Sequence, residues 1–258
     1  MLLVVDVGNS HTVLGVFHRE RLLHSWRVTT RRETTSHEYA ALIGNLFSLH
    51  RIPPEGIRGV AVCSVVPPLN EAMGELCRES FGVEPLFLEP ARQSLIPVRY
   101  HRPEEVGADR VANALAAREM FGTPCVVVDF GTATTFDVIS AEGEYLGGAI
   151  APGLGIAAEA LYARTARLPR IEIRPPGRCI GRTTVESMQA GLYFGYLGLV
   201  ERILADTARE LGTRPRVVAT GGFANLLARD GAPFDSVEPH LTLHGLRIFF
   251  AAYREAGG

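Results

Sequence analysis

The chain has 258 residues, 47 % of them hydrophobic and 21 % charged, which is typical of a folded soluble protein and excludes a disordered or collagen-like chain. Its 26 basic and 28 acidic residues give a net charge of −2, so no overall field attracts nucleic acid or an anionic membrane. All the basic residues are arginine, which excludes Schiff-base chemistry, a pyridoxal phosphate anchor and a P-loop lysine.

The first half of the chain predicts a β-rich start followed by helices. Residues 2–16 read as an apolar strand, a tight polar turn and a second strand, and a third strand follows at 22–28. Thr35 and Glu38 form a capping-box pattern that predicts a helix, and a short strand is expected at 59–64. Helices are expected at 68–81 and 109–121, because Gly82 and Gly122 suit the position after a helix end.

The second half repeats this order. Residues 125–139 again read as strand, turn and strand, and strands follow at 145–150 and 216–220. Thr183 and Glu186 form a second capping-box pattern, which opens a helix over 185–211. In that helix Gly191, Gly195 and Gly198 lie near one face and would let another helix approach closely.

The repeat has a constant offset. Asp6 and Gly8 return as Asp129 and Gly131, each 123 residues later. Two related α/β domains are therefore expected, residues 1–118 and 119–258, with a last helix at 241–254 that is long enough to pack back on the first domain.

Each repeated turn has chemistry suited to a polyphosphate. An acidic strand end followed by glycine and small polar residues offers backbone N–H groups to phosphate and a carboxylate to a hydrated metal ion. Gly8 and Gly131 would be needed because a Cβ would block close approach or a positive φ. For one copy alone an Asx-type β-turn is the simpler interpretation, but two copies at matching positions favour phosphate binding.

The cysteines and the chain start indicate a cytoplasmic protein. Cys63, Cys77, Cys125 and Cys179 are widely spaced, which predicts reduced thiols rather than a zinc site or disulfides. Residues 1–6 lack the basic head of a secretory signal, and no apolar run approaches the roughly 18 residues of a membrane span.

The repeated turn resembles the phosphate motifs of the acetate and sugar kinase, Hsp70 and actin superfamily. Within it the chain is similar to type III pantothenate kinases: the matching segments are D-V-G-N-S-H-T (6–12), G-A-D-R (107–110), D-F-G-T-A-T-T (129–135), G-G-A-I-A-P-G (147–153) and T-G-G (220–222). Ser10 stands where the family usually has threonine, and serine keeps the hydroxyl. The resemblance implies an α/β fold of two duplicated actin-like (ribonuclease H-like) domains with mixed sheets and an ATP cleft between them.

The resemblance also implies roles for individual residues. Asp109 is the expected general base, which takes the proton from the pantothenate hydroxyl as that hydroxyl attacks the γ-phosphate. Magnesium is expected near Asp6, through water, and a monovalent cation, potassium or ammonium, at Asp129. The remaining residues bind substrates: Asp6, Val7, Gly8, Asn9, Ser10, His11, Thr12, Val13 and Thr132 bind ATP, and Tyr100, Gly107, Ala108, Asp109, Arg110 and Thr184 surround pantothenate.

Simpler interpretations stay open for several of these residues. Asp109 also suits the N-terminus of a helix. Thr184 can be part of a helix cap, whereas the resemblance places it at a subunit interface. Tyr100 could be a half-buried strand aromatic, and Asp129 a second magnesium-directing carboxylate.

Three further features receive no catalytic role. His11 can face phosphate or solvent, and Asp137 is interpreted as structural. Residues 164–178 contain five arginines without an aromatic platform, which favours a solvated or interface-forming loop over a nucleic-acid site.

The resemblance therefore implies a homodimeric, ATP-dependent kinase that phosphorylates pantothenate to 4′-phosphopantothenate, the first step of coenzyme A synthesis. The alternatives are another small-molecule kinase or a phosphatase of the superfamily, and a pantothenate-kinase-like transcriptional accessory protein.

Overall fold

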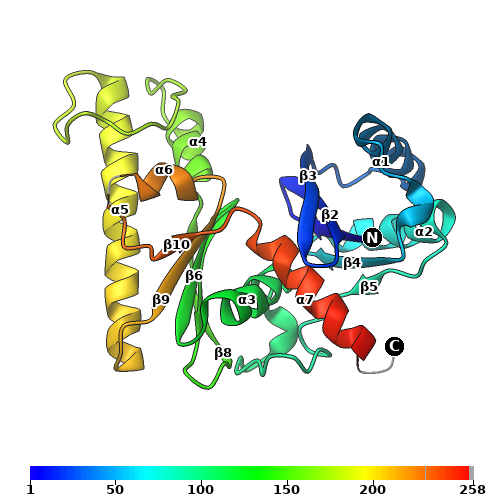
Figure 1. Ribbon diagram of the computed structural model, residues 1–258. Helices are drawn as coiled ribbons and strands as arrows, with labels where there is room; N and C mark the ends of the chain where they lie inside the picture. Colours follow the sequence, from blue (N-terminus) through cyan, green and yellow to red (C-terminus); the bar gives the residue numbers. More distant parts are fainter. Residues whose placement is uncertain (230, 256–258) are drawn as a thin grey trace. The chain divides into compact units, whose positions relative to one another are not determined.

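The computed structural model describes residues 1–229 and 231–255, which form two compact units (Figure 1). The first unit comprises Met1–Ala116 together with the chain from Leu241 on, and the second comprises Ala117–His240. The division expected at residues 118 and 119 differs from this one by two residues, and α7 (Leu241–Glu255) groups with the first unit.

The first unit is built on a five-stranded mixed sheet. Its strands lie in the order β3-β2-β1-β4-β5, in which β2 is antiparallel to β1 and β3, whereas β4 is parallel to β1 and β5. The elements are β1 (Leu2–Val7), β2 (His11–His18), β3 (Arg21–Thr29), α1 (Ser36–His50), η1 (Pro54–Gly56), β4 (Gly59–Ser64), η2 (Pro67–Leu69), α2 (Asn70–Phe81), β5 (Leu86–Phe87), η3 (Pro103–Glu105) and most of α3 (Ala108–Phe121), which continues into the second unit from Ala117 on.

The second unit repeats the same sheet. Its order β8-β7-β6-β9-β10 has the same antiparallel and parallel pairings, with β6 in the place of β1. The elements are β6 (Cys125–Phe130), β7 (Ala133–Ile139), β8 (Tyr145–Pro152), α4 (Leu154–Arg164), α5 (Thr184–Leu211), β9 (Arg216–Gly221), α6 (Ala224–Ala228) and β10 (Ser236–Val237). The duplication read from the sequence is therefore present in the topology.

Along β1, successive side chains face opposite sides of the sheet, and only one of these sides is the apolar core. Leu3, Val5 and Val7 point into an apolar core shared with α1 and α2. The intervening residues, Val4 and Asp6, belong to the opposite face, where α7 packs on the sheet. Asp6 thus leaves the core because it stands one residue out of phase with the apolar set.

Close contacts hold α7 against α3. A Cβ at Gly245 would overlap the backbone carbonyl of Ala112, so only glycine lets the two helices approach this closely. The Thr242 hydroxyl also donates to Oδ1 of Asn113 at 2.8 Å. The helix that carries Asp109 is therefore fixed by an element from the other end of the chain.

The second unit has the same alternation. Val126, Val128 and Phe130 belong to a core shared with α5 and α6, and Asp129 lies between them in the sequence. Asp129 therefore occupies the face of its sheet that corresponds to the face of Asp6.

Helix ends agree closely with the sequence patterns. Thr35 and Glu38 form the full capping box of α1, and Gly82 and Gly122 adopt positive φ after α2 and α3. At α5 the Thr183 hydroxyl accepts from the N–H of Glu186, but the Glu186 carboxylate accepts from the N–H of Arg182 at 2.7 Å. The return bond of the second box is thus displaced by one residue.

No other described helix lies against the glycines of α5. A Cβ at Gly191, Gly195 or Gly198 would have no described atom within 4 Å outside the backbone of α5 itself. Within residues 1–229 and 231–255, no helix is long and apolar enough to cross a membrane.

Candidate active site

The first repeated turn joins β1 to β2 through residues 8–10. The N–H of Gly8 donates to the carbonyl of His11 at 3.0 Å, and a Cβ at Gly8 would lie 2.9 Å from that oxygen. Gly8 is therefore required by close approach and not by a positive φ, the other reason expected from the sequence. Asn9 and His11 are exposed, and Ser10 is half-buried.

The remaining residues predicted at this turn are more enclosed. Val7 lies in the core, and Val13 is half-buried on β2. The buried Thr12 hydroxyl lies 2.9 Å from the hydroxyl of Thr30, the residue that follows β3. Only the backbone of Val7 can therefore serve a ligand, because its side chain is committed to the core.

Asp6 lies beside a cysteine that the sequence analysis gave no role. Parallel pairing places Cys63 of β4 opposite Asp6, and its thiol donates to Oδ1 of Asp6 at a sulfur–oxygen distance of 3.3 Å. Burial, followed by the negative charges of Asp6 and Asp109, raises the pKa of the Cys63 thiol well above its usual value. Asp6 and Asp109, far apart in the sequence, are thus both close enough to act on one buried thiol.

Asp109 is held at the first turn of α3. Its Oδ1 accepts from the backbone N–H of Arg110 at 2.8 Å, and a Cβ at Gly107 would overlap that oxygen. Burial raises the pKa of Asp109 above 3.8, against the opposing hydrogen bond and charge of Arg110. A carboxylate with a raised pKa at a fixed position is suited to accept a proton.

The other residues predicted around pantothenate divide between the units. Ala108 and Arg110 are buried, and Arg110 is only 7 % exposed although it carries a charge. Tyr100 is half-buried in an irregular segment, so it is not the strand aromatic considered from the sequence. Thr184 is exposed at the first turn of α5 in the second unit, directly after the capping Thr183.

The second repeated turn, Gly131–Thr132, lies against the start of α4. A Cβ at Gly153, the residue that precedes α4, would overlap the carbonyls of Gly131 and Thr132. The N-terminal end of an 11-residue helix therefore faces this turn, and such an end favours anions. At Gly131 itself φ is not positive and a Cβ would contact other atoms at 3.5 Å or more, so neither expected reason for glycine applies.

Asp129 is enclosed by the end of a neighbouring strand. Gly221 follows Thr220 on β9 with φ +88°, and a Cβ there would lie 2.5 Å from Oδ1 of Asp129. The T-G-G segment thus meets Asp129 within the second unit because Gly221 leaves room for the carboxylate.

Asp137 is fully buried on β7. Its carboxylate accepts from the Tyr145 hydroxyl at 2.8 Å and from the Thr135 hydroxyl at 3.1 Å. These bonds offset part of the cost of burying a charge and agree with a structural role.

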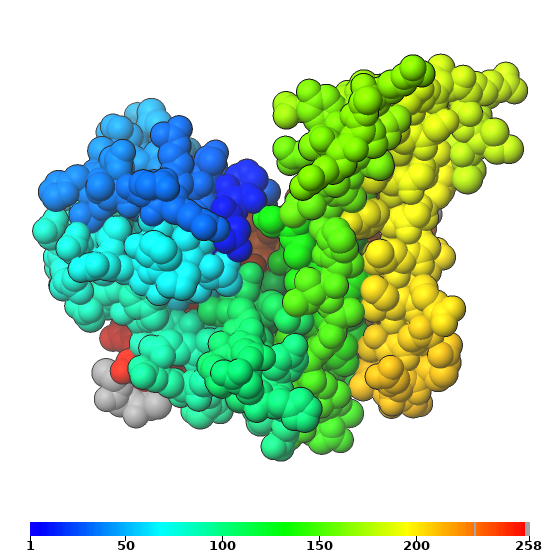
Figure 2. Space-filling view, turned by 180° about the vertical axis from the view of Figure 1, so that it is seen from behind, coloured from blue at the N-terminus to red at the C-terminus, as the bar shows by residue number. Residues whose placement is uncertain are grey.

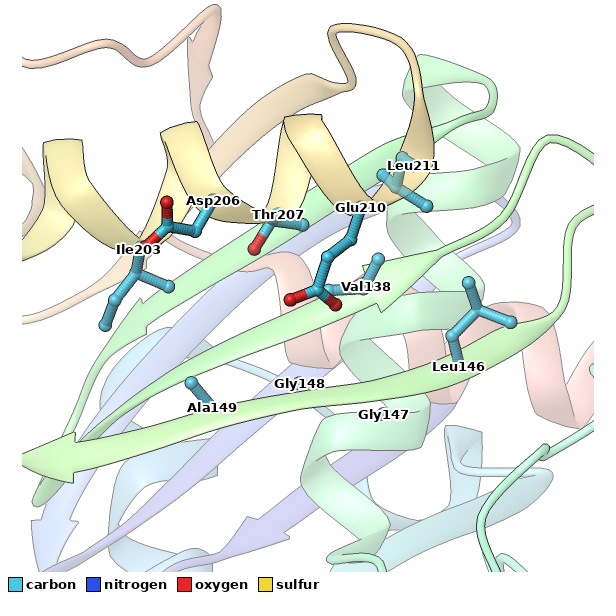
Figure 3. A pocket seen from close by; sticks show the side chains of 10 residues that line it. All are labelled: Val138, Leu146, Gly147, Gly148, Ala149, Ile203, Asp206, Thr207, Glu210 and Leu211. Atoms are coloured by element: carbon cyan, nitrogen blue, oxygen red, sulfur yellow. The ribbon is translucent and has the colours of Figure 1, made fainter.

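A cavity of about 420 Å³ lies elsewhere in the second unit, between α5 and the strands β7 and β8 (Figure 3). Asp206, Thr207 and Glu210 line it from α5. Asp206 is paired with Arg202 and Arg209, each at 2.7 Å. The cavity contains none of the predicted site residues, and its carboxylates disfavour phosphate groups.

Comparison with known proteins decides between the families that share such a fold. Residues 2–206 match the model of the family described as type III pantothenate kinase. A type III pantothenate kinase of Koribacter versatilis (strain Ellin345) is 50 % identical over 260 residues, which cover 97 % of this chain and 95 % of that protein. The chain belongs to the type III pantothenate kinase family.

Similarity to solved structures supports the fold of this pantothenate kinase. A Baf family protein from Campylobacter jejuni, named as a transcriptional activator, aligns with TM-score 0.61 and 19 % identity over 98 % of this chain and 99 % of its own. The activator of the 2-hydroxyisocaproyl-CoA dehydratase from Clostridium difficile, solved with ADPNP, aligns with TM-score 0.57 and 11 % identity over 99 % and 96 %. At these identities the likeness carries the actin-like fold and no function.

Family membership makes the chain a kinase: a transferase that uses ATP with a divalent metal ion and phosphorylates pantothenate in coenzyme A synthesis. The sequence analysis assigned no role to Cys63, and it included Gly153 only as the last residue of the G-G-A-I-A-P-G segment. The start of α4 after the G-G-A-I-A-P-G segment could have indicated Gly153, but nothing in the sequence paired Cys63 with Asp6.

Proposed function

We propose that this chain converts pantothenate to 4′-phosphopantothenate with Asp109 as the general base. The observation that supports this proposal most is the burial of Asp109 at the start of α3, in the same unit as Asp6. This burial raises the pKa of the Asp109 carboxyl. Asp109 orients the substrate hydroxyl and accepts its proton at a carboxylate oxygen as the bond to phosphorus forms. Positioning and charge neutralisation supply the rest of the rate enhancement.

ATP is bound by the two duplicated turns, Asp6 to Val13 and the turn with Thr132. The start of α4, which faces the second turn, supports this assignment; at the first turn the N–H of Gly8 is already bonded to the carbonyl of His11, which leaves the N–H groups of the other turn residues for phosphate. Exposed backbone N–H groups of such turns bind phosphate oxygens.

The donors present fit the metal ions of a kinase. In the part of the chain that the structure describes, no group of three or more His, Cys, Asp or Glu side chains could hold a metal ion. Magnesium needs no such group, because it keeps several waters and binds one or two carboxylates together with substrate phosphates. We assign magnesium to Asp6, through water, and a monovalent cation, potassium or ammonium, to Asp129; bound metal neutralises phosphate charge.

Pantothenate is surrounded by Tyr100, Gly107, Ala108 and Arg110. The buried guanidinium of Arg110, next to the base, suits a bidentate bond to the substrate carboxylate. Tyr100 covers the apolar part of the substrate.

The working form is a homodimer in which Thr184 of one protomer completes the pantothenate site of its partner. Large apolar side chains are exposed on α4, on the end of β8 and around the start of α5, among them Ile180 at 82 % and Ile150 at 63 %. Figure 2 shows the segment between α4 and α5 on the surface, in yellow-green. A second copy that covers these side chains would remove them from water. Four cysteines without a disulfide support a cytoplasmic location.

Phosphorylation of pantothenate by the purified protein with Mg-ATP, followed by mass in parallel potassium and sodium buffers, tests these assignments. Product formed mainly in potassium supports both the kinase and the monovalent cation. Product at equal rates in both buffers removes the cation from Asp129 and leaves the kinase. A folded protein that binds nucleotide and forms no product would favour another substrate or the accessory-protein alternative.

A further inference from the structure

Cys63 makes a directed contact with a residue of the proposed ATP site. It is completely buried on β4, and its thiol donates to one carboxylate oxygen of Asp6 at 3.3 Å. The contact follows from register, because parallel pairing places Cys63 opposite Asp6, with Val62 opposite Val5 and Ser64 opposite Val7. Val62 belongs to the apolar core, so Cys63 is turned to the other face, toward Asp6.

The second unit places a donor-bearing side chain at the corresponding position. Asp129 on β6 is paired with Thr220 on β9 in the same parallel register that joins Asp6 to Cys63. Thr220 is 3 % exposed and Cys63 is fully buried. In both copies the neighbour of the acidic residue is thus a small buried residue with an S–H or O–H group, where a purely packing position would admit valine or alanine.

A hydrogen bond of this kind restricts the carboxylate. Without a donor, an aspartate at a strand end can rotate about χ2, which is a broad torsion. A donor fixed by a central strand selects one orientation of the carboxylate plane and holds it before ligand arrives. Loss of such a partner of a metal-directing group typically costs 10- to 100-fold in metal affinity or activity.

We propose that Cys63 is a positioning residue that orients the Asp6 carboxylate toward the metal-bound phosphates of ATP. The inference rests on the proposed role of Asp6. Because a thiol is a weak donor, we expect an effect near the lower limit of that range, about tenfold.

Two substitutions separate the hydrogen bond from packing. Cys63→Val fills the site without a donor, whereas Cys63→Ser keeps a donor but buries a more polar group. We expect Cys63→Val to be at least as stable to heat as Cys63→Ser. Packing alone would then favour the valine variant in every assay, whereas positioning favours the serine variant in metal-dependent binding. Cys125→Val and Cys125→Ser, at a buried strand cysteine of the second unit, are the matched controls.

The readout is the binding of ADP by calorimetry with and without Mg²⁺, which does not depend on turnover. We expect the Mg²⁺-dependent gain in affinity to fall about tenfold in Cys63→Val, to be retained in Cys63→Ser and to be unchanged in both Cys125 variants. An infrared difference spectrum, wild type minus Cys63→Val, should show an S–H band at lower frequency than that of Cys125, and Asp6→Asn should move it upward.

The variant Asp6→Asn distinguishes a failure of the proposed role of Asp6 from a failure of the inference about Cys63. If it keeps the full Mg²⁺-dependent gain, the proposed role of Asp6 fails, and with it the inference about Cys63. If it loses the gain while Cys63→Val binds as wild type does, the inference about Cys63 alone is overturned.

Discussion

Replacing Asp109 by asparagine should lower activity and raise stability at the same time. The asparagine amide keeps the shape that fits against Gly107, and its oxygen can still accept from the N–H of Arg110, now 2.8 Å from Oδ1. It cannot take a proton from the substrate. General base catalysis contributes typically 10²- to 10⁴-fold, so kcat should fall by that factor, which corresponds to about 3 to 5 kcal/mol.

The stability gain follows from the sign of the pKa shift. Burial raises the folded pKa of Asp109 above 3.8, so the ionised carboxylate is less favourable in the folded chain than in the unfolded one. Below pH 3.8 both states are protonated and the cost is absent; it develops as pH rises and is complete above the folded pKa. Asp109→Asn should therefore match wild type at acid pH and exceed it at pH 7.

Urea unfolding at several pH values, together with the pH profile of kcat/KM, measures both effects. The acid limb of the wild-type profile should lie above pH 3.8, because the base must be ionised to act. The matched control is Asp206→Asn: hydrogen bonding to Arg202 lowers the pKa of Asp206, so this variant should lose stability at pH 7 and keep activity. Near wild-type turnover in Asp109→Asn would refute the base. A stability difference from wild type that is the same at pH 3 and pH 7 would refute the account of its burial.

Three further predictions concern Gly153, the cysteines and the N-terminal cap of α1. Gly153→Ala should displace the Gly131–Thr132 turn, raise the KM for ATP and lower the free energy of unfolding by about 1 to 3 kcal/mol. Gly155→Ala is the control, because its Cβ would lie 3.8 Å from Phe223, and it should leave the KM unchanged. Steady-state kinetics and thermal unfolding test both variants. A thiol reagent should modify one cysteine of the folded protein, the exposed Cys179, and four after denaturation. The other three are buried, and the pKa of Cys77 and of Cys125 is raised to about 12. Labelling of a second thiol in the folded protein at the rate of Cys179 would contradict this prediction. Thr35→Ala should lower the free energy of unfolding by about 1 kcal/mol through loss of the α1 cap, and an unchanged urea midpoint would show that the cap contributes nothing.

Most of the fold could be predicted from local patterns in the sequence. Strand, turn and strand in residues 2–16 and 125–139, the α1 capping box and the glycines after α2 and α3 all depend on neighbours within a few residues, and the structure contains them. The pairing of Asp6 with Cys63 depends on a parallel register between β1 and β4, which are separated in the sequence by two strands, the helix α1 and a 3-10 turn. Such a register is set by tertiary packing, so the thiol beside the carboxylate could not be predicted from either segment.

The glycines show the same limit. Three glycines on one face of α5 indicated a close helix contact, yet the described chain leaves that face open. The close helix approach is at Gly245 of α7, against the carbonyl of Ala112. A single glycine in a helix forms no sequence pattern, and Gly245 is needed because of the position of α3 and not because of its own segment.

The two copies of the hairpin differ in a way that supports different roles for their acids. The first turn has one more residue than the second, so Asp6 faces Val13 across the hairpin, whereas Asp129 faces Thr135. Two residues further along the same strands, Gly15 corresponds to the buried Asp137, which accepts from the Thr135 hydroxyl. Thr135 and Asp137 thus place further oxygens beside Asp129 on its face of the sheet, whereas the corresponding positions on β2 beside Asp6 are Val13 and Gly15. A weakly hydrated monovalent cation needs several oxygen donors, while hydrated magnesium needs one carboxylate and the phosphates, which supports magnesium at Asp6 and potassium or ammonium at Asp129.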